Sequence, residues 1–233
     1  ATAMVRTGAV RNALVIGAEV ISRAMEWSNR DVAVLFGDGA AAMYIEASDS
    51  EEGVLAESLG CEGAVRDILT VHGMGMSYRG DASGRFRWQF EGQEIFRHAV
   101  QGMVSASQAV LAKRGLSIDD LDLVVPHQAN LRIIEAVAKR ARIPAEKVFV
   151  NIHRYGNMSA ATAPVALVEA VEEGRVTPGS TILVPAFGGG LSWSATLLRW
   201  GDRVEPLRQS DAVLPPCQSN GLEQVQQIRR ESR

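Results

Sequence analysis

The stretch Val-Pro-His-Gln-Ala-Asn at residues 125–130 follows an apolar run at 121–125 and precedes an amphipathic segment at 131–140. The apolar run has the length and composition of a short buried strand, and the spacing of apolar residues after it predicts a helix. His127 then stands at the carboxyl end of a strand, on the turn into a helix. Open α/β sheets carry their chemistry at such turns, so this stretch is the first candidate for a functional site.

Two further strand ends are predicted after it. A strand at 147–151 leads to Tyr-Gly-Asn-Met-Ser-Ala-Ala at 155–161, with a helix of small residues from 159 to 173. A strand at 181–186 runs into Phe-Gly-Gly-Gly at 187–190, and a strand at 192–200 completes the sheet. Three strand ends would therefore deliver an imidazole, an amide and a flexible glycine backbone.

The earlier part of the chain supplies the frame for these ends. Apolar runs at 13–17, 32–36 and 41–47 are predicted to be strands, and the first is continuous enough to suggest burial on both faces. Residues 92–114 form the longest helix candidate, with Gly115 as its stop. Because strands alternate with helices at this spacing, the sequence predicts an α/β layered fold.

Composition sets two parts of the chain apart. From residue 202 the sequence becomes polar, and we predict a mobile tail over 202–233 with a short helix at 222–230. Residues 48–90 are rich in glycine, charge and methionine, and we interpret them as a long excursion from the sheet. Such an excursion is a candidate wall of a binding site, and surface decoration is the alternative.

Composition excludes several classes of function. The 233 residues carry a net charge of −3, which gives no basic field for nucleic acid. No apolar run approaches the roughly 20 residues that span a bilayer, so a membrane partner is not expected. The two cysteines, Cys61 and Cys217, lie in unlike contexts and support neither a disulfide framework nor a metal site. A reducing compartment is the simplest reading, and we expect the cytoplasm.

Four motifs together resemble one family, β-ketoacyl-acyl-carrier-protein synthase III of the thiolase superfamily. They are Val-Pro-His-Gln-Ala-Asn-Leu-Arg-Ile-Ile at 125–134, Tyr-Gly-Asn-Met-Ser-Ala-Ala at 155–161, Phe-Gly-Gly-Gly at 187–190 and Phe-Gly-Asp-Gly-Ala at 36–40. The match runs in order from about residue 1 to residue 200. The resemblance implies a five-layered αβαβα thiolase fold, incomplete in this chain, and a homodimer. It also implies that residues 1–50 are the remainder of an N-terminal thiolase-like half and that residues 51–201 are the C-terminal half with the His and Asn motifs.

The resemblance also implies an activity. The family extends an acyl group from acyl-CoA by decarboxylative condensation with malonyl-carrier protein at a Cys-His-Asn site, with these two substrates and no cofactor. His127 and Asn157 occupy the His and Asn positions. The family's cysteine heads a helix that here would lie just before Ala1, so we expect this chain to be the C-terminal portion of a longer protein. An activated thiolate needs a helix N-terminus or a basic neighbour, which neither Cys61 nor Cys217 shows.

Further site residues are implied by the resemblance. The substrate-binding candidates are Arg30, Phe36, Gly92, Phe96, Asn130, Phe187, Gly188 and Gly189. The candidates for binding the acidic carrier protein are Arg97, Arg132, Lys139 and Arg140. Each assignment has an ordinary alternative. Arg30 could be a solvated loop residue, Asn130 could satisfy the backbone of a turn, and the apolar residues could simply pack in the core. The basic residues of the second set could lie on solvated helix faces. Two other functions stay open, namely a related acyltransferase that does not decarboxylate and a non-catalytic acyl-CoA-binding protein of the same fold.

Overall fold

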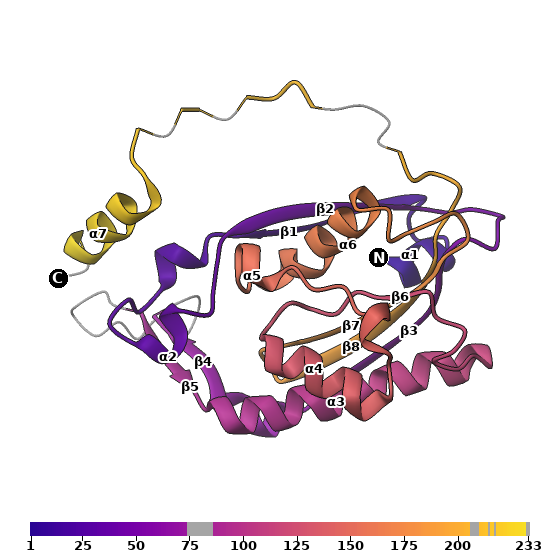
Figure 1. Ribbon diagram of the computed structural model, residues 1–233, viewed down its shortest axis with the longest axis horizontal. Helices are drawn as coiled ribbons and strands as arrows, with labels where there is room; N and C mark the ends of the chain where they lie inside the picture. The colour runs from indigo at the N-terminus through magenta and orange to yellow at the C-terminus, as the bar shows by residue number, and fades with distance from the viewer. Residues whose placement is uncertain (74–85, 206–209, 214, 217, 232–233) are drawn as a thin grey trace.

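The structure, a computed structural model, describes residues 1–73, 86–205, 210–213, 215–216 and 218–231 (Figure 1). Its centre is a four-stranded sheet in the order β3 (Gly53–Cys61), β8 (Ser192–Arg199), β7 (Thr181–Gly188) and β6 (Leu123–Val124). Strands β6 and β7 pair in parallel, whereas β7–β8 and β3–β8 pair antiparallel. The strands predicted around 121–125, 181–186 and 192–200 are therefore confirmed.

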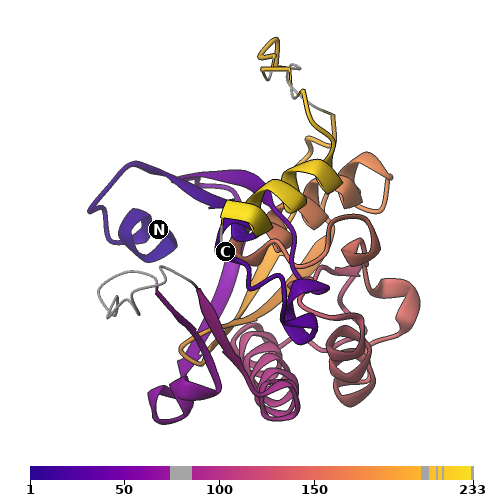
Figure 2. The ribbon, with the colours of Figure 1, turned by 90° about the vertical axis from the view of Figure 1, so that its left-hand side faces the viewer.

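Helices cover both faces of this sheet. Helices α3 (Gly92–Arg114) and α4 (Leu131–Ala141) lie side by side on one face, as Figures 1 and 2 both show. Helix α6 (Thr162–Glu172) covers the other face, with the short α5 (Ile152–Tyr155) beside it (Figure 1). Successive residues of β7 point to opposite layers, because Ile182 packs in the cluster under α6 and Leu183 in the cluster under α3.

A further layer lies beyond α6. Strands β1 (Asn12–Glu19) and β2 (Gly39–Glu46) form an antiparallel ribbon whose inner face packs on α6 and on η5 (Ser159–Ala161). The described residues thus stack as ribbon, helix, sheet and helix, four successive layers (Figure 1). This arrangement confirms the predicted α/β layered fold.

The remaining elements lie at the edges of these layers. They are α1 (Thr2–Arg6), η1 (Ile21–Ala24), α2 (Arg30–Ala33), η2 (Gly63–Ile68), β4 (Leu69–His72), β5 (Arg87–Phe90), η4 (Ala145–Lys147) and α7 (Gly221–Glu231). The last of these confirms the helix predicted in the tail, at whose end it lies in Figure 1. Within the part of the chain that the structure describes, no helix combines the length and apolarity that crossing a membrane requires.

Two predicted strands are wrong. Residues 147–151 contribute only a single bridge, between Val148 and Val124, because Pro144 and the 3-10 turn η4 shape the chain just before it. In the run 32–36, helix α2 takes the first residues, since the side chain of Asn29 accepts a hydrogen bond from the Asp31 backbone N–H and caps it. Phe36 then forms a lone parallel bridge with Asn157.

The interpretation of the apolar run 13–17 is half wrong. It forms β1 as predicted, but the strand is not buried on both faces: Leu14 is 60% exposed and Ile16 is 63% exposed. Tyr44, the β2 residue opposite Leu14, is 59% exposed on the same face. Only the other face, at Gly17, is buried. A continuous apolar run indicates that the strand would gain from burial, but it does not show which of its faces packs against another layer.

The excursion at 48–90 is more regular than the sequence suggests. It contains β3, η2 and an antiparallel pair formed by β4 and β5. Much of its glycine- and methionine-rich stretch, residues 74–85, lies outside the described residues.

Gly17 sets the distance between the β1–β2 ribbon and the segment that carries the candidate site. A Cβ atom at Gly17 would lie 2.8 Å from the backbone carbonyl of Ala160, closer than carbon atoms pack. We expect Gly17→Val to lower the free energy of unfolding by about 1–3 kcal/mol in urea denaturation. The matched control is Ala18→Val, on the exposed face of the same strand. Equal effects of the two substitutions would contradict this account.

Candidate active site

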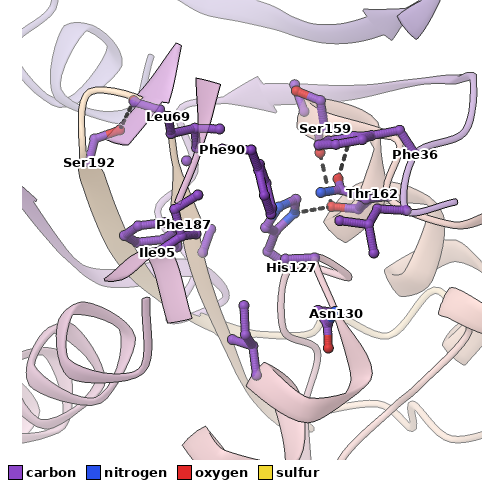
Figure 3. Close-up of a pocket in the computed structure, with 18 of the residues that line it drawn as sticks. Phe36, Leu69, Phe90, Ile95, His127, Asn130, Ser159, Thr162, Phe187 and Ser192 are labelled. Atoms are coloured by element: carbon purple, nitrogen blue, oxygen red, sulfur yellow. Dashed lines mark hydrogen bonds between the residues drawn. The ribbon is translucent and has the colours of Figure 1, made fainter. Parts of the chain in front are cut away.

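A large cavity lies where the strand ends meet. Its volume is 1510 Å³, and loops at the ends of β6 and β7, the β4–β5 pair and the start of α3 all contribute to its lining (Figure 3). His127 and Asn157 both line it, so the structure brings together the two residues that the sequence analysis placed at separate strand ends. Cavities for small ligands occupy about 300–1,000 Å³, so this one is spacious.

The parallel pairing of β6 with β7 positions His127. The backbone N–H of Val125 donates to Leu183 O at 2.8 Å, and that of His127 donates to Pro185 O at 2.8 Å. These bonds continue the ladder past the end of β6, so the chain stays extended until His127 has reached the cavity.

The His127 side chain is buried, with 8% of the residue exposed. Its Nδ1 atom is hydrogen-bonded to Thr162 Oγ1, which leaves Nε2 as the ring nitrogen available to the cavity (Figure 3). Burial disfavours the imidazolium and lowers the pKa of His127 to about 4. The imidazole is therefore neutral near pH 7 and carries one proton on one of its two nitrogens.

Asn157 is held by a neighbouring segment and by its own turn. Its backbone N–H donates to Leu35 O at 2.9 Å, and its carbonyl accepts from the Gly37 N–H at 3.0 Å. The side-chain Oδ1 accepts from the Ser159 N–H at 2.9 Å. Because the oxygen of the amide is bound in this way, its Nδ2 group is the part left to donate elsewhere.

The Asn157 turn depends on the glycine before it. Gly156 has a φ of 69°, and a Cβ atom there would lie 3.1 Å from Leu35 O. A side chain at this position would be strained and would press on the segment that holds Asn157. The Tyr-Gly-Asn motif is therefore explained by backbone geometry.

Gln128 links the two halves of the site. Its side chain is completely buried, and Nε2 donates to Pro126 O at 2.8 Å and to Phe149 O at 3.2 Å. Its Oε1 accepts from the N–H groups of Asn151 and Ile152 at 3.0 and 3.2 Å. One carboxamide thus joins the His127 turn to the start of α5, which leads directly into Asn157. The sequence analysis did not single out Gln128, because the residues around it give no sign that its side chain is buried.

A second polar cluster fixes α5 on α6. Glu169 accepts hydrogen bonds from Asn151 Nδ2 at 2.8 Å and from the Tyr155 hydroxyl, and lies 3.3 Å from Arg154 Nη1. Burial alone would raise the pKa of Glu169, but the hydrogen bonds from Tyr155 and Asn151 and the charge of Arg154 outweigh it and lower the pKa. Glu169 therefore stays ionised and holds α5 in place.

Aromatic side chains form much of the cavity wall. The rings of Phe36 and Trp88 have centroids 4.8 Å apart, and the Trp88 indole N–H donates to Ala24 O at 2.9 Å. Leu69, Val71, Trp88 and Phe90 all line the cavity. The segment 48–90 therefore does contribute a wall, as the sequence analysis expected.

A second indole, Trp193, sits in a slot made by two glycines. A Cβ atom at Gly60 would lie 2.2 Å from Trp193 Nε1, and one at Gly102 would lie 2.7 Å from Cγ of the same ring. Gly60 is on β3 and Gly102 is on α3, so the ring fills the space between sheet and helix while also lining the cavity. By contrast, Cβ atoms at Gly188 and Gly189 would meet nothing within 4 Å.

The other candidate residues divide between the cavity and the outer surface. Those that line the cavity are Phe36, Gly92, Phe96, Asn130, Arg132, Phe187, Gly188 and Gly189. Those outside its lining, all exposed, are Arg30, Arg97, Lys139 and Arg140. Asn130 also caps α4, since its Oδ1 accepts from the Arg132 N–H at 2.9 Å. The turn role left open for Asn130 is thus present beside its place in the cavity.

The layered stack with His127 and Asn157 at one cavity defines a protein of the thiolase fold. Residues 111–200 match the family described as 3-Oxoacyl-[acyl-carrier-protein (ACP)] synthase III C terminal, and residues 1–63 match 3-Oxoacyl-[acyl-carrier-protein (ACP)] synthase III. The chain belongs to the 3-oxoacyl-[acyl-carrier-protein] synthase III family of the thiolase superfamily.

Relatives and solved structures agree on this family. Beta-ketoacyl-[acyl-carrier-protein] synthase III 2 of Vibrio cholerae is 48% identical over 225 residues, which cover 96% of this chain and 62% of that protein. The synthase III structure from Aquifex aeolicus matches with a TM-score of 0.76 and 44% identity, over 85% of this chain and 61% of that one. The structure from Thermus thermophilus gives a TM-score of 0.80 at 39% identity, covering 87% and 63%. The chain thus spans about three fifths of the length of these relatives.

The low pKa of His127 predicts how stability depends on pH. Between pH 6.5 and 4 the unfolded chain binds a proton at this residue and the folded chain does not, so acidification favours unfolding. We expect His127 to account for about 2 kcal/mol of the stability lost between pH 7 and pH 5. Urea denaturation at both pH values would measure it, with His127→Gln as the neutral control. A decline of the same size in the variant would contradict the assignment.

The Gln128 carboxamide predicts a large effect on stability. Gln128→Leu would leave two buried carbonyls, the buried N–H of Asn151 and the partly buried N–H of Ile152 without their partner. Each unsatisfied buried group costs about 1–3 kcal/mol. We expect a loss of at least about 3 kcal/mol in urea denaturation. Gln108→Leu, the same exchange at an exposed position of α3, serves as the control and should change stability by less than about 0.5 kcal/mol. A loss no larger than in the control would refute the linking role of Gln128.

Proposed function

We propose that the protein is a condensing enzyme that joins the acyl group of an acyl-CoA to malonyl-carrier protein and releases CO2 and 3-oxoacyl-carrier protein. One observation carries the proposal: His127 and Asn157 line one cavity, and one polar atom of each side chain is already hydrogen-bonded within the protein. These atoms are Nδ1 of His127, bonded to Thr162, and Oδ1 of Asn157, bonded to Ser159. What each side chain leaves for the cavity is Nε2 of the imidazole and Nδ2 of the amide. A site that only bound acyl-CoA would need neither of them.

The chemistry needs donors that stabilise an oxyanion. When the malonyl thioester loses CO2, the electron pair of the breaking C–C bond moves into an enolate and negative charge develops on the thioester oxygen. Two N–H groups aimed at this oxygen, from His127 and Asn157, lower the barrier because their orientation is fixed before the charge appears. A neutral imidazole suits this role, since it donates a hydrogen bond without protonating the enolate carbon.

The second half of the reaction needs a thiol ester on the enzyme. The enolate carbon attacks the acyl carbonyl, the C–S bond to the enzyme breaks, and the thiolate leaves. Cys61 lies at the end of β3 and is exposed, and it is not part of the cavity lining. Cys217 lies outside the described residues, and its sequence context, Leu-Pro-Pro-Cys-Gln-Ser-Asn, offers no basic neighbour. We therefore propose that the nucleophilic cysteine is not among the 233 residues of this chain. Glycine at 188–190 would let backbone N–H groups approach the acyl oxyanion.

The remaining residue assignments follow the same proposal. Gly92, Phe96 and Asn130 would line the entry path of the thioester, with Phe36 and Phe187 along its walls. Arg30 would contact the CoA nucleotide. The exposed basic residues Arg97, Arg132, Lys139 and Arg140 would face the acidic carrier protein, with Arg132 reaching the cavity itself.

Assembly and compartment complete the proposal. The enzyme would be a homodimer, as the family resemblance implies, which light scattering of the full-length protein would check. It would act in the cytoplasm, where its two cysteines would stay reduced, and fractionation of the source cells would test this.

Separate assays of the two half-reactions test the proposed roles. In the full-length protein, His127→Ala and Asn157→Ala should each lower CO2 release from malonyl-carrier protein by about 10²–10³-fold, because each removes one donor to the enolate oxygen. Transfer of an acyl group from acyl-CoA to the enzyme, followed by intact mass, should be largely retained. His153→Ala, at an exposed position of α5, is the matched control and should leave both steps unchanged.

The outcomes separate the alternatives. Lost self-acylation with normal decarboxylation would reverse the assigned roles. Acyl transfer by the wild-type protein to another acceptor, with no CO2 from malonyl-carrier protein, would identify an acyltransferase that does not decarboxylate. Binding of acyl-CoA with neither reaction would identify a non-catalytic binding protein.

A further inference from the structure

The Thr162 hydroxyl lies between the imidazole of His127 and a backbone carbonyl. Thr162 is completely buried at the start of α6, where its Oγ1 contacts His127 Nδ1 and lies 3.0 Å from Ser159 O (Figure 3). Among the residues that the structure describes, this hydroxyl is the hydrogen-bond partner of His127 Nδ1. The group to which the hydroxyl donates its one proton therefore determines which imidazole nitrogen is protonated.

Counting protons leaves two arrangements. If the hydroxyl donates to Ser159 O, its oxygen must accept from His127, so the imidazole proton sits on Nδ1 and the cavity faces a bare Nε2. If the hydroxyl donates to His127 Nδ1, the imidazole proton sits on Nε2 and points into the cavity. The rotation of one hydroxyl thus decides whether His127 offers the cavity an acceptor or a donor.

In the second arrangement the hydroxyl gives up its hydrogen bond to Ser159 O, but the backbone keeps this carbonyl satisfied. Ser159 O already accepts a hydrogen bond from the backbone N–H of Thr162 in the 3-10 turn η5. The carbonyl stays satisfied when the hydroxyl turns away from it, whereas His127 Nδ1 has no such second donor among the described residues.

The same turn orients the second donor. The Ser159 N–H binds Asn157 Oδ1, and Ser159 adopts a φ of 49°, in the left-handed region that few residues other than glycine occupy. The segment from Ser159 to Thr162 thus holds one hydrogen-bonding atom of each catalytic side chain. Both side chains would then present N–H groups to the cavity.

We infer that Thr162 is a positioning residue whose hydroxyl donates to His127 Nδ1 and so holds the imidazole proton on Nε2, where it points at the reacting oxygen. This inference rests on the proposed function, which needs a donor at that atom. It assigns to Thr162 a choice of tautomer, in addition to packing at the start of α6.

Nitrogen NMR of the full-length protein tests the tautomer directly. In wild-type protein labelled with ¹⁵N in the histidine rings, the shifts of His127 at pH 7 should show a protonated Nε2 and an unprotonated Nδ1. In Thr162→Val this preference should be lost or reversed, and in Thr162→Ser it should be kept. A wild-type proton on Nδ1 would overturn the inference, and this measurement needs no variant to fold.

Kinetics give the second readout. Thr162→Val should lower CO2 release from malonyl-carrier protein by at least about tenfold, as a wrong tautomer does, with self-acylation kept. Thr162→Ser should stay within about threefold of wild type, and so should Thr177→Val, the same exchange at an exposed turn. Full activity in Thr162→Val would overturn the inference.

The two measurements keep the inference apart from the proposed function. If wild-type protein releases no CO2, the proposed function fails, while the ring shifts still decide whether Thr162 sets the tautomer. If CO2 is released but the ring shifts of Thr162→Val equal those of wild type, the role of Thr162 fails alone.

Discussion

The buried carboxamide of Gln128 is the constraint on which the site depends. His127 and Asn157 come from turns 30 positions apart along the sequence, and neither turn contacts the other through a strand ladder. Gln128 joins them by bonding to four backbone groups, two on each of its polar atoms. A buried amide satisfied at every position has one orientation, so it fixes the separation of the segments it joins. The ionised Glu169 then holds the second segment on α6.

Burial and hydrogen bonding act on the side chains of His127 and Asn157 in complementary ways. The low-dielectric surroundings keep His127 neutral, and its partner on Nδ1 limits what the ring can offer the cavity. Asn157 needs no such control of charge, but its amide could rotate by half a turn, which the Ser159 N–H prevents by binding the oxygen. The preorganisation of the site therefore resides in the η5 turn at least as much as in the two side chains themselves.

The sequence predicts this site well where local pattern and chemistry coincide. The apolar run before His127, the glycine before Asn157 and the glycine stop of α3 are local signals, and the elements that they predict are present. The errors arise where contacts with distant parts of the chain decide whether a segment forms a strand and which face is buried. The run at 13–17 is apolar on both faces, yet only the Gly17 side meets another layer of the described structure. Residues 147–151 lie beside Val124 but form a single bridge.

The residues missed by sequence reasoning have a common cause. Gln128, Thr162 and Glu169 are ordinary polar residues in the sequence, and their importance comes from partners 14 to 35 positions away.

The slot that holds Trp193 also depends on residues distant in the sequence, and it affects how the cavity can change in evolution. The indole both lines the cavity and fills the space between Gly60 and Gly102, so a substitution that reshapes this wall also disturbs the packing of β3 on α3. At Gly188 and Gly189, where an added side chain would meet only open space, the cavity can narrow without that penalty. Substitutions that change substrate choice would therefore accumulate more readily at Gly188 and Gly189 than at Trp193. A substitution at Trp193 would alter specificity only at a cost in stability.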